Sequence, residues 1–332
     1  MGTAGGVPAD WLVERLGVRL LSQSPVGGGS IHSAWCLQLE GAGSRRLFAK
    51  TNGASALPQL EAEADGLAAL AVAAAATGLS VPAPLALGLA GDRAVLVLPW
   101  LERSRPDEEH WGRLGAGLAR LHRASLGRSC ASEDRSDAFG WQRDNWIGSG
   151  PQINGWESDW GRFFCERRLA PQAALLARRG LALPGLERLL AWVPDWLATH
   201  RPEPCLVHGD LWSGNAMARL GGVTQAGADP SAAAPAEGGA AGPAKDGAAI
   251  FDPAVYRGDR EVDLAMARLF GGFPAAFFAG YAAVWPLAAD HRRRIGLYNL
   301  YHLLNHANLF GGGYVDQARQ QIVSCHAAME QD

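Results

Sequence analysis

The residues His208-Gly209-Asp210-Leu211-Trp212-Ser213-Gly214-Asn215 follow the apolar run Cys205-Leu206-Val207 and have the spacing of a phosphotransferase catalytic loop. Transfer of phosphate to an alcohol requires a carboxylate that orients and deprotonates the hydroxyl, and an amide oxygen that binds the magnesium on the nucleotide phosphates. Asp210 suits the first role, and Asn215, five positions later, suits the second. The alternative is a surface turn whose Asp and Asn side chains bond to local backbone.

A second segment favours catalysis. The residues Ala249-Ile250-Phe251-Asp252 form a short apolar run that ends in a carboxylate, and Pro253 then stops strand pairing. A kinase needs such an aspartate after its catalytic loop, because metal-holding groups from two segments must converge on the β- and γ-phosphates. Asp252 is therefore the second magnesium candidate. Taken alone, it could begin an ordinary Asp-Pro turn.

Length and composition describe an ordinary globular protein. The 332 residues can bury a full core in two lobes or domains, and 48% of them are hydrophobic against a net charge of -3. The sequence has no excess of basic residues that would indicate a nucleic-acid partner. It also has no apolar run long enough to indicate a membrane span. The first residues lack signal-peptide features, so we expect a cytoplasmic protein. The five scattered cysteines and nine histidines show no metal-ligand spacing, and the oligomeric state is left open.

A glycine-rich turn lies near the N-terminus. Val26-Gly27-Gly28-Gly29-Ser30-Ile31 precedes a predicted strand at 34–39, and another predicted strand ends at Lys50. At Gly28, Gly29 and Ser30 the backbone N–H groups could approach a phosphate closely, because glycine has no Cβ. A flexible hairpin is the alternative.

Lys50 needs a partner if it points inward, and helix geometry selects one. The helix predicted over 60–70 has an apolar stripe formed by Leu60, Leu67 and Leu70. Glu63 lies on that stripe, whereas Glu61 lies about 100° away around the helix. A carboxylate on a buried stripe needs a cation, so we expect Glu63 to pair with Lys50 and aim it at the α- and β-phosphates. The alternative is two solvated charges that never meet.

The strand predicted at 93–98 runs into Pro99-Trp100-Leu101, which we interpret as a lobe boundary. It would divide the chain into an N-terminal nucleotide-binding lobe (1–101) and a C-terminal catalytic and substrate lobe (102–332). An adenine ring could lie against Pro99, Trp100 and Leu101, with the Pro99 carbonyl accepting from its amine and the Leu101 N–H donating to its ring nitrogen. A simple linker is the alternative.

The rest of the chain is predicted to be mainly helical. Apolar residues at helical spacing predict helices within 111–121, 186–197 and 292–308, whose stripes we assign to the core. Residues 221–247 differ, because nearly all are Gly, Ala, Pro or small polar residues. Such a segment has too few bulky side chains to offset the entropy of ordering, so we expect a flexible, dispensable surface insertion.

Two long motifs carry a resemblance to a known family: the stretch 208–215 and the block 251–266, FDPAVYRGDREVDLAM. Supporting matches are Gly28-Gly29-Ser30-Ile31-His32, Phe48-Ala49-Lys50, Pro151-Gln152-Ile153-Asn154 and Tyr301-His302-Leu303-Leu304-Asn305. With these residues the chain resembles the fructosamine/ketosamine-3-kinase family, in the protein-kinase-like superfamily with aminoglycoside phosphotransferases and choline kinases. The fold this implies is α+β and bilobal, with a small antiparallel-sheet N-lobe carrying one helix and a larger, mainly helical C-lobe.

The resemblance implies phosphorylation, by ATP with Mg²⁺, of the sugar 3-hydroxyl of a ketoamine. The implied acceptors are ribulosamine, erythrulosamine or fructosamine adducts on protein lysines or free amines. This reaction serves deglycation in the family, because the 3-phosphate falls apart and frees the amine. The roles carried over are Asp210 as proton acceptor, Asn215 and Asp252 as magnesium ligands, Lys50 with Glu63 at the phosphates, and 99–101 at adenine.

The substrate side and the departures from protein kinases complete the prediction. Gly209 stands where protein kinases usually have an arginine that binds a phosphorylated activation loop. We therefore expect no regulation by phosphorylation of such a loop. Trp212 replaces a lysine near the transferred phosphate and could stack on a sugar. Asp259 or Asp263 could accept from sugar hydroxyls, although Asp263 could equally cap a predicted helix. Ser30 stands where some relatives carry cysteine, so we expect no thiol switch in the glycine-rich turn.

Two other functions are compatible with parts of the sequence. An aminoglycoside- or choline-type phosphotransferase would keep the chemistry, but no strongly acidic cleft is indicated for a polycationic drug. A non-catalytic nucleotide-binding scaffold would not need a base, and so would not require Asp210 together with Asn215, Asp252 and Lys50.

Overall fold

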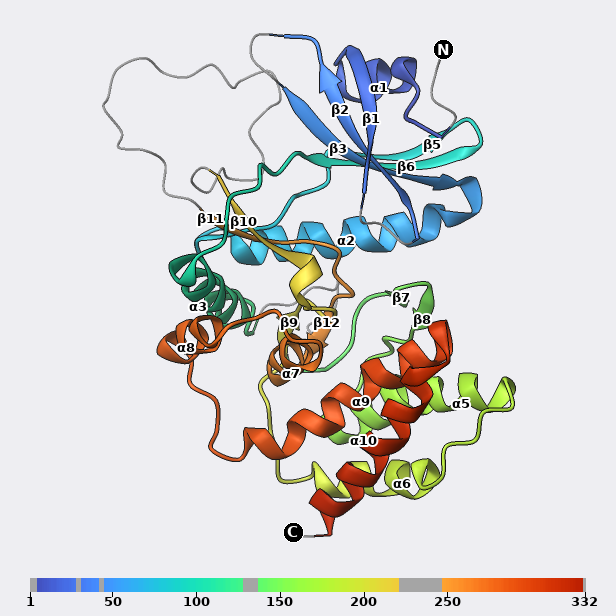
Figure 1. The fold of residues 1–332 in the computed structure, drawn as a ribbon, viewed down its shortest axis with the longest axis vertical. Helices are drawn as coiled ribbons and strands as arrows, with labels where there is room; N and C mark the ends of the chain where they lie inside the picture. Colours follow the sequence, from blue (N-terminus) through green and yellow to red (C-terminus); the bar gives the residue numbers. More distant parts are fainter. Residues whose placement is uncertain (1–4, 28–30, 42–44, 128–136, 221–246, 331–332) are drawn as a thin grey trace.

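The first hundred residues build a five-stranded antiparallel sheet with helix α2 (Leu57–Ala74) beneath it (Figure 1). The order across the sheet is β1 (Leu20–Val26), β2 (Ser33–Leu39), β3 (Arg46–Gly53), β6 (Arg93–Pro99) and β5 (Ala86–Ala90). The computed structural model describes residues 5–27, 31–41, 45–127, 137–220 and 247–330. The strands predicted at 34–39 and 93–98 are confirmed as β2 and β6, and together these elements confirm the small antiparallel-sheet lobe.

This lobe has a second helix, so the prediction of one helix was incomplete. Helix α1 (Ala9–Leu16) buries Trp11 and Leu12 against the outer face of the sheet, in a small cluster with Trp35 and Leu37. The Trp11 indole N–H also donates to the Leu89 carbonyl at 2.9 Å. Eight residues span only about two turns, which is too short for a clear helical period in the sequence.

The lower lobe is mainly helical, as predicted. Its helices are α3 (Glu108–Ala124), α4 (Trp160–Phe163), α5 (Ala170–Arg178), α6 (Leu186–Trp196), α7 (Glu261–Leu269), α8 (Ala275–Val284), α9 (His291–Phe310) and α10 (Gly313–Met329). A π-helical turn, Phe164–Leu169, joins α4 to α5. The stripes predicted within 111–121, 186–197 and 292–308 lie on α3, α6 and α9 and contribute to the core. The bilobal α+β architecture is therefore confirmed.

Short strand pairs occupy the middle of the molecule and carry the loops of interest (Figure 1). They are β9 (Cys205–Val207) with β12 (Tyr256–Gly258), β7 (Asn145–Ile147) with β8 (Gly150–Gln152), and β10 (Ala216–Arg219) with β11 (Gly247–Ile250). Strand β4 (Leu79–Ser80), which follows α2, pairs in parallel with β11. Gly247 belongs to β11, so the insertion predicted at 221–247 is one residue too long at its end; residues 221–246 lie outside the described residues.

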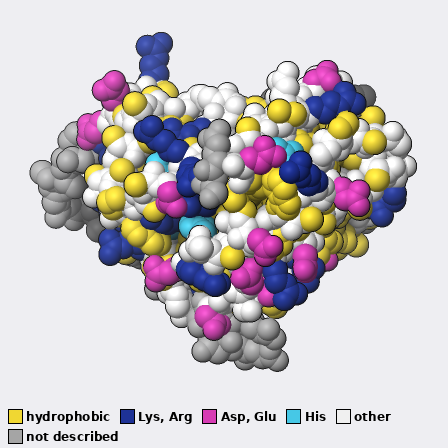
Figure 2. Space-filling view, turned by 90° about the horizontal axis from the view of Figure 1, so that it is seen from below, with side chains coloured by type: hydrophobic (Ala, Val, Ile, Leu, Met, Phe, Trp, Pro, Cys, Tyr) yellow, Lys and Arg dark blue, Asp and Glu magenta, His cyan; other side chains and the backbone are white. Residues whose placement is uncertain are grey.

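One large core runs through both lobes. Leu60 and Leu67 of α2 and Leu96 of β6 belong to the same cluster of buried side chains as Leu118 of α3 and Leu300 of α9. The division at residue 101 therefore stays a prediction. Within the described residues, no helix combines the length and apolar character needed to cross a bilayer. On the face shown in Figure 2, acidic and basic side chains are interspersed among apolar ones.

Candidate active site

The stretch 208–215 forms the loop between β9 and β10. All three residues of β9 are buried, and a short 3-10 turn, Ser213–Asn215, leads into β10. The Asp263 carboxylate, on the first turn of α7, accepts the backbone N–H groups of His208 at 2.8 Å and Gly209 at 2.9 Å. Asp263 also pairs with His122 at 3.1 Å, and it is fully buried. It therefore supports the loop from beneath, which corrects the expectation that it contacts a substrate or caps its own helix.

Three of the predicted site residues meet around one amide. The Asn215 Nδ2 group donates to the Asp210 carbonyl at 2.9 Å, to the Asp210 carboxylate at 3.3 Å and to the Asp252 carbonyl at 3.3 Å. With its Nδ2 turned to protein, Asn215 keeps its Oδ1 for another ligand. Segments separated by more than thirty residues therefore bring the two aspartates to the same place, as the sequence predicted.

Lys50 on β3 links the sheet to this group. Its ammonium lies 2.7 Å from Glu63 and also pairs with Asp252. Glu61 instead pairs with Arg143 near the surface at 3.6 Å. The prediction that Glu63 rather than Glu61 meets Lys50 is therefore confirmed.

The charges of Lys50, Glu63 and Asp252 shift the pKa values of one another. Burial alone would lower the pKa of Lys50, but the carboxylates of Glu63 and Asp252 raise it above its ordinary value. Burial opposes ionisation of Asp252, yet the Lys50 ammonium holds the pKa of Asp252 below its usual value. Both groups are therefore charged at neutral pH, as a site for a metal and phosphates requires.

Asp252 is held in an unusual backbone conformation. Its φ of 56° is the one positive value at a non-glycine residue in the described part of the chain. Such a conformation costs on the order of 1–3 kcal/mol and persists only where surrounding contacts fix it. Its side chain remains 44% exposed, so the carboxylate that pairs with Lys50 also faces solvent.

Asp210 has the proton affinity of a base. Burial raises its pKa from 3.8 to about 7, and the neighbouring negative charge of Asp252 adds to this effect. A carboxylate with a pKa near neutrality can accept a proton from an alcohol and later release it. This environment distinguishes Asp210 from an aspartate in a surface turn, which was the alternative reading of the sequence.

Two glycines in the loop allow close packing. Gly209 has a φ of 80°, and a Cβ there would lie 2.0 Å from the Ala254 carbonyl oxygen. An arginine cannot occupy this position without displacing the segment after Asp252. A Cβ on Gly214 would lie 2.2 Å from the Trp212 ring, which lies over it and is 41% exposed. Trp212 is therefore open to a ligand, and its contact with substrate stays a prediction.

The residues predicted to hold adenine, Pro99 to Leu101, lie at the end of β6 and directly after it. Pro99 ends β6 opposite Leu47, and the Arg46 guanidinium lies 5.1 Å from the centre of the Trp100 ring. Leu101 follows at the start of the crossover to α3. Gly28, Gly29 and Ser30 lie outside the described residues. Just beyond them, burial and the nearby Lys50 charge lower the pKa of His32 to about 4, so this flank comes close to Lys50.

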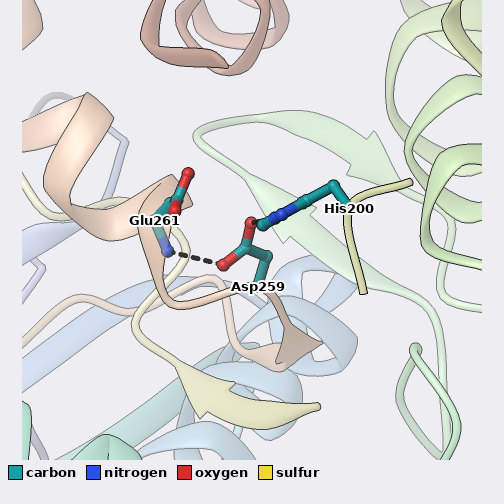
Figure 3. A group of neighbouring side chains, drawn as sticks. All are labelled: His200, Asp259 and Glu261. Carbon is teal, nitrogen blue, oxygen red and sulfur yellow. Dashed lines mark hydrogen bonds and ion pairs between the residues drawn. The ribbon is translucent and has the colours of Figure 1, made fainter. Parts of the chain in front are cut away.

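Asp259 belongs to a separate buried network (Figure 3). Its carboxylate accepts from His200 at 2.7 Å, from the Tyr298 hydroxyl at 2.7 Å and from the Glu261 backbone N–H at 3.0 Å. Arg294 binds both oxygens of Glu261 at 2.8 and 2.9 Å. The spacing of His200, Asp259 and Glu261 could suit a metal, but these bonds already engage every carboxylate oxygen. Asp259 is 1% exposed, which corrects the expectation that it contacts a substrate.

Comparison with known proteins places this chain in a family. A sequence profile described as fructosamine kinase matches residues 9–328. The chain belongs to the fructosamine kinase family. It is therefore a kinase that transfers phosphate, and the predicted resemblance is confirmed.

Individual relatives agree along most of their length. A protein described as a probable ketoamine kinase from Synechocystis is 41% identical, over 92% of this chain and 91% of its own. A chloroplastic protein-ribulosamine 3-kinase from rice, Oryza sativa subsp. indica, is 34% identical over 94% of this chain and 80% of its own. A solved structure described as a putative fructosamine-3-kinase from Haemophilus somnus has a TM-score of 0.76 and 25% identity, with 96% of each chain covered.

A more distant solved structure shares the fold alone. The aminoglycoside phosphotransferase APH(4)-Ia, in a complex with ADP and hygromycin B, has a TM-score of 0.57 at 16% identity, with 97% of each chain covered. This likeness confirms a kinase-like architecture. Nucleotide binding by this chain follows instead from its membership of a kinase family.

Proposed function

We propose that this kinase transfers the γ-phosphate of ATP to the 3-hydroxyl of a ketoamine sugar, with ribulosamine, erythrulosamine or fructosamine adducts as acceptors. The observation that carries this proposal is the meeting of Asp210, Asn215, Asp252 and Lys50 within one hydrogen-bonded group. The rice relative, described as a ribulosamine 3-kinase, supports the acceptor class. The amine can belong to a protein lysine or to a free amine, and release of that amine from the 3-phosphate would make the enzyme a deglycase.

In this proposal each side chain has one task. Asp210 orients the hydroxyl and accepts its proton, and Lys50, held by Glu63, binds the α- and β-phosphates. Pro99, Trp100 and Leu101 hold the adenine, and Trp212 lies against the sugar. Gly28, Gly29 and Ser30 remain the proposed backbone contacts to phosphate.

The residues fit a magnesium ion on the nucleotide. Asn215 offers an amide oxygen and Asp252 a solvent-facing carboxylate oxygen, and oxygen ligands of this kind are those that Mg²⁺ prefers beside substrate phosphates. The ion would neutralise charge on the phosphates. The two ligands come from different segments, whose relative position the Asn215 hydrogen bonds fix.

A substrate panel tests the proposal. The protein is assayed with ATP and Mg²⁺ against ribulosyl-, erythrulosyl- and fructosyl-lysine, kanamycin and choline, with phosphate position read by ³¹P NMR. We expect acceptor-dependent turnover with ketoamines and phosphorylation at the 3-hydroxyl. Turnover confined to kanamycin or choline would contradict the proposal, and reactions without acceptor measure background ATP hydrolysis.

A further inference from the structure

Amide side chains of the β7–β8 hairpin donate hydrogen bonds to the segment after Asp252. The Gln152 Nε2 group donates to the Ala254 carbonyl at 3.0 Å, and the Asn145 Nδ2 group donates to the Val255 carbonyl at 2.8 Å. Two successive carbonyls of the turn that follows Asp252 are thus bound from one side. From the other side, Ala254 donates its N–H to the His208 carbonyl at 2.9 Å.

Gln152 is the central residue of this hydrogen-bond network. Its side chain makes three hydrogen bonds, because Nε2 also donates to Asn145 Oδ1 at 2.8 Å and Oε1 accepts the Tyr301 hydroxyl at 2.8 Å. Gln152 is 1% exposed. It therefore joins the hairpin, the turn after Asp252 and helix α9, which meet below α2 in Figure 1.

A buried cation anchors the far end of the network. Arg168 is fully buried and donates to Asn154 Oδ1 at 2.7 Å, while the Asn154 amide donates to Asn145 Oδ1 at 2.8 Å. The Arg168 guanidinium lies 3.9 Å from the centre of the Tyr256 ring. Because each amide donates to the next oxygen, this chain fixes the orientation of Asn145 and, through it, of Gln152.

We infer that Gln152, with Tyr301, is a positioning residue that holds the turn after Asp252 so that the Asp252 carboxylate stays directed at the nucleotide-bound metal. The strained φ of 56° at Asp252 needs such external contacts, and Gln152 and Asn145 supply them at the Ala254 and Val255 carbonyls, two and three residues further along the chain. Gln152 touches neither Asp210 nor Lys50 in this network, so it acts through the backbone. This inference rests on the proposed function, because it assigns Asp252 to the metal.

The test separates positioning from folding by measuring nucleotide affinity with and without Mg²⁺. Gln152→Met removes the hydrogen bonds at similar size, and Tyr301→Phe removes one hydroxyl and keeps the ring. Titration calorimetry measures the affinity for a non-hydrolysable ATP analogue with and without Mg²⁺. The increase in affinity caused by Mg²⁺ should be smaller by ~10-fold or more in Gln152→Met. This is the size of effect seen when a residue that orients a metal ligand is replaced. Metal-free affinity should stay unchanged. Without metal, amide hydrogen exchange at residues 252–256 should be faster in Gln152→Met than in the unaltered protein.

Gln172→Met is the matched control. Gln172 is also 1% exposed, and its Oε1 accepts from Asn308 at 2.8 Å between α5 and α9. An equal loss of the Mg²⁺ effect in this control, or a full Mg²⁺ effect in both Gln152→Met and Tyr301→Phe, would overturn the inference. If Gln152→Met does not fold, the Tyr301→Phe result decides. Absence of nucleotide binding by the unaltered protein would instead overturn the proposed function.

Discussion

Asp210 combines a partly buried position with an adjacent negative charge, and this environment determines when it can act as a base. Its pKa of about 7 means that the carboxylate form is lost as the pH falls through neutrality. An aspartate in water, with a pKa near 3.8, would remain ionised throughout that range. The local environment therefore makes the proposed proton acceptor sensitive to pH.

A pH profile should report this property. Because the proposed base must be deprotonated, kcat/KM for a ketoamine should decrease about tenfold per pH unit below neutrality and level off above it. The measurement is kcat/KM for the acceptor at saturating ATP and Mg²⁺, with nucleotide affinity followed at each pH. A flat profile through neutrality, with unchanged nucleotide affinity, would show that Asp210 is not the group that accepts the proton.

For single residues, the sequence predicted contacts correctly where local helix geometry determines them. Glu63 could be chosen over Glu61 because a helix fixes which side chains share a face, and the Lys50 ion pair agrees. Asp259 and Asp263 were assigned wrongly, because their partners come from distant elements such as α3 and α9. Gln152 lay in a supporting motif without a role, since two of its three hydrogen-bond partners, Ala254 and Tyr301, are also remote in sequence.

Hydrogen bonds hold helix α7 against the loop formed by residues 208–215. Asp263, on the first turn of α7, binds two successive N–H groups of the loop. Burial opposes its ionisation, but the His122 hydrogen bond and charge hold the pKa of Asp263 below its usual value. Its stabilising effect is therefore present above the ordinary aspartate pKa and is lost only as the pH falls into the acid range.

Replacing this carboxylate should weaken the fold. In Asp263→Asn an amide N–H would face backbone donors, so we expect a loss of about 2–4 kcal/mol in the free energy of unfolding at neutral pH. Urea denaturation measures the difference. Asp316→Asn is the control, because Asp316 is exposed and pairs with Arg319 on the surface at 2.9 Å, where the change should stay below ~1 kcal/mol. Equal, small losses in both variants would refute the role of Asp263.

Elements with a clear period were predictable, and short or irregular ones were not. Helices α3, α6 and α9 were found because their apolar residues recur at helical spacing over several turns. Strand β1, with the sequence LLSQSPV, contains Pro25 and shows no alternation of apolar and polar residues, so no strand was predicted there. The β7–β8 hairpin has only three residues in each strand, and tertiary contacts define it.

At the scale of the whole molecule, the two lobes meet through Lys50 and Asp252. The ammonium comes from β3 of the sheet and the carboxylate from the segment after β11. Strand β4 also joins β11, so the segment that presents Asp252 is tied to the chain after α2. The bilobal fold therefore places the proposed phosphate and metal groups at the junction of both halves.

The segment 221–246 can be tested as a unit. Arg219 and Gly247 are paired opposite each other at the ends of β10 and β11, so a short turn can join them. Replacing 221–246 by a short Asn-Gly turn should leave the unfolding temperature and ketoamine turnover close to those of the full chain. A variant that folds but loses activity would show that the segment contributes to function.

The role of Asp210 as proton acceptor is tested by comparing Asp210→Asn with the unaltered protein in phosphorylation of ribulosyl-lysine, with ATP affinity measured on the same preparations. Because the folded pKa of Asp210 lies above its ordinary value, ionisation at this position costs stability as the pH rises, so Asp210→Asn should be no less stable above neutral pH. The expected result is that kcat falls by at least ~10²-fold while ATP affinity is retained. A near-normal kcat in a folded, ATP-binding variant would contradict it.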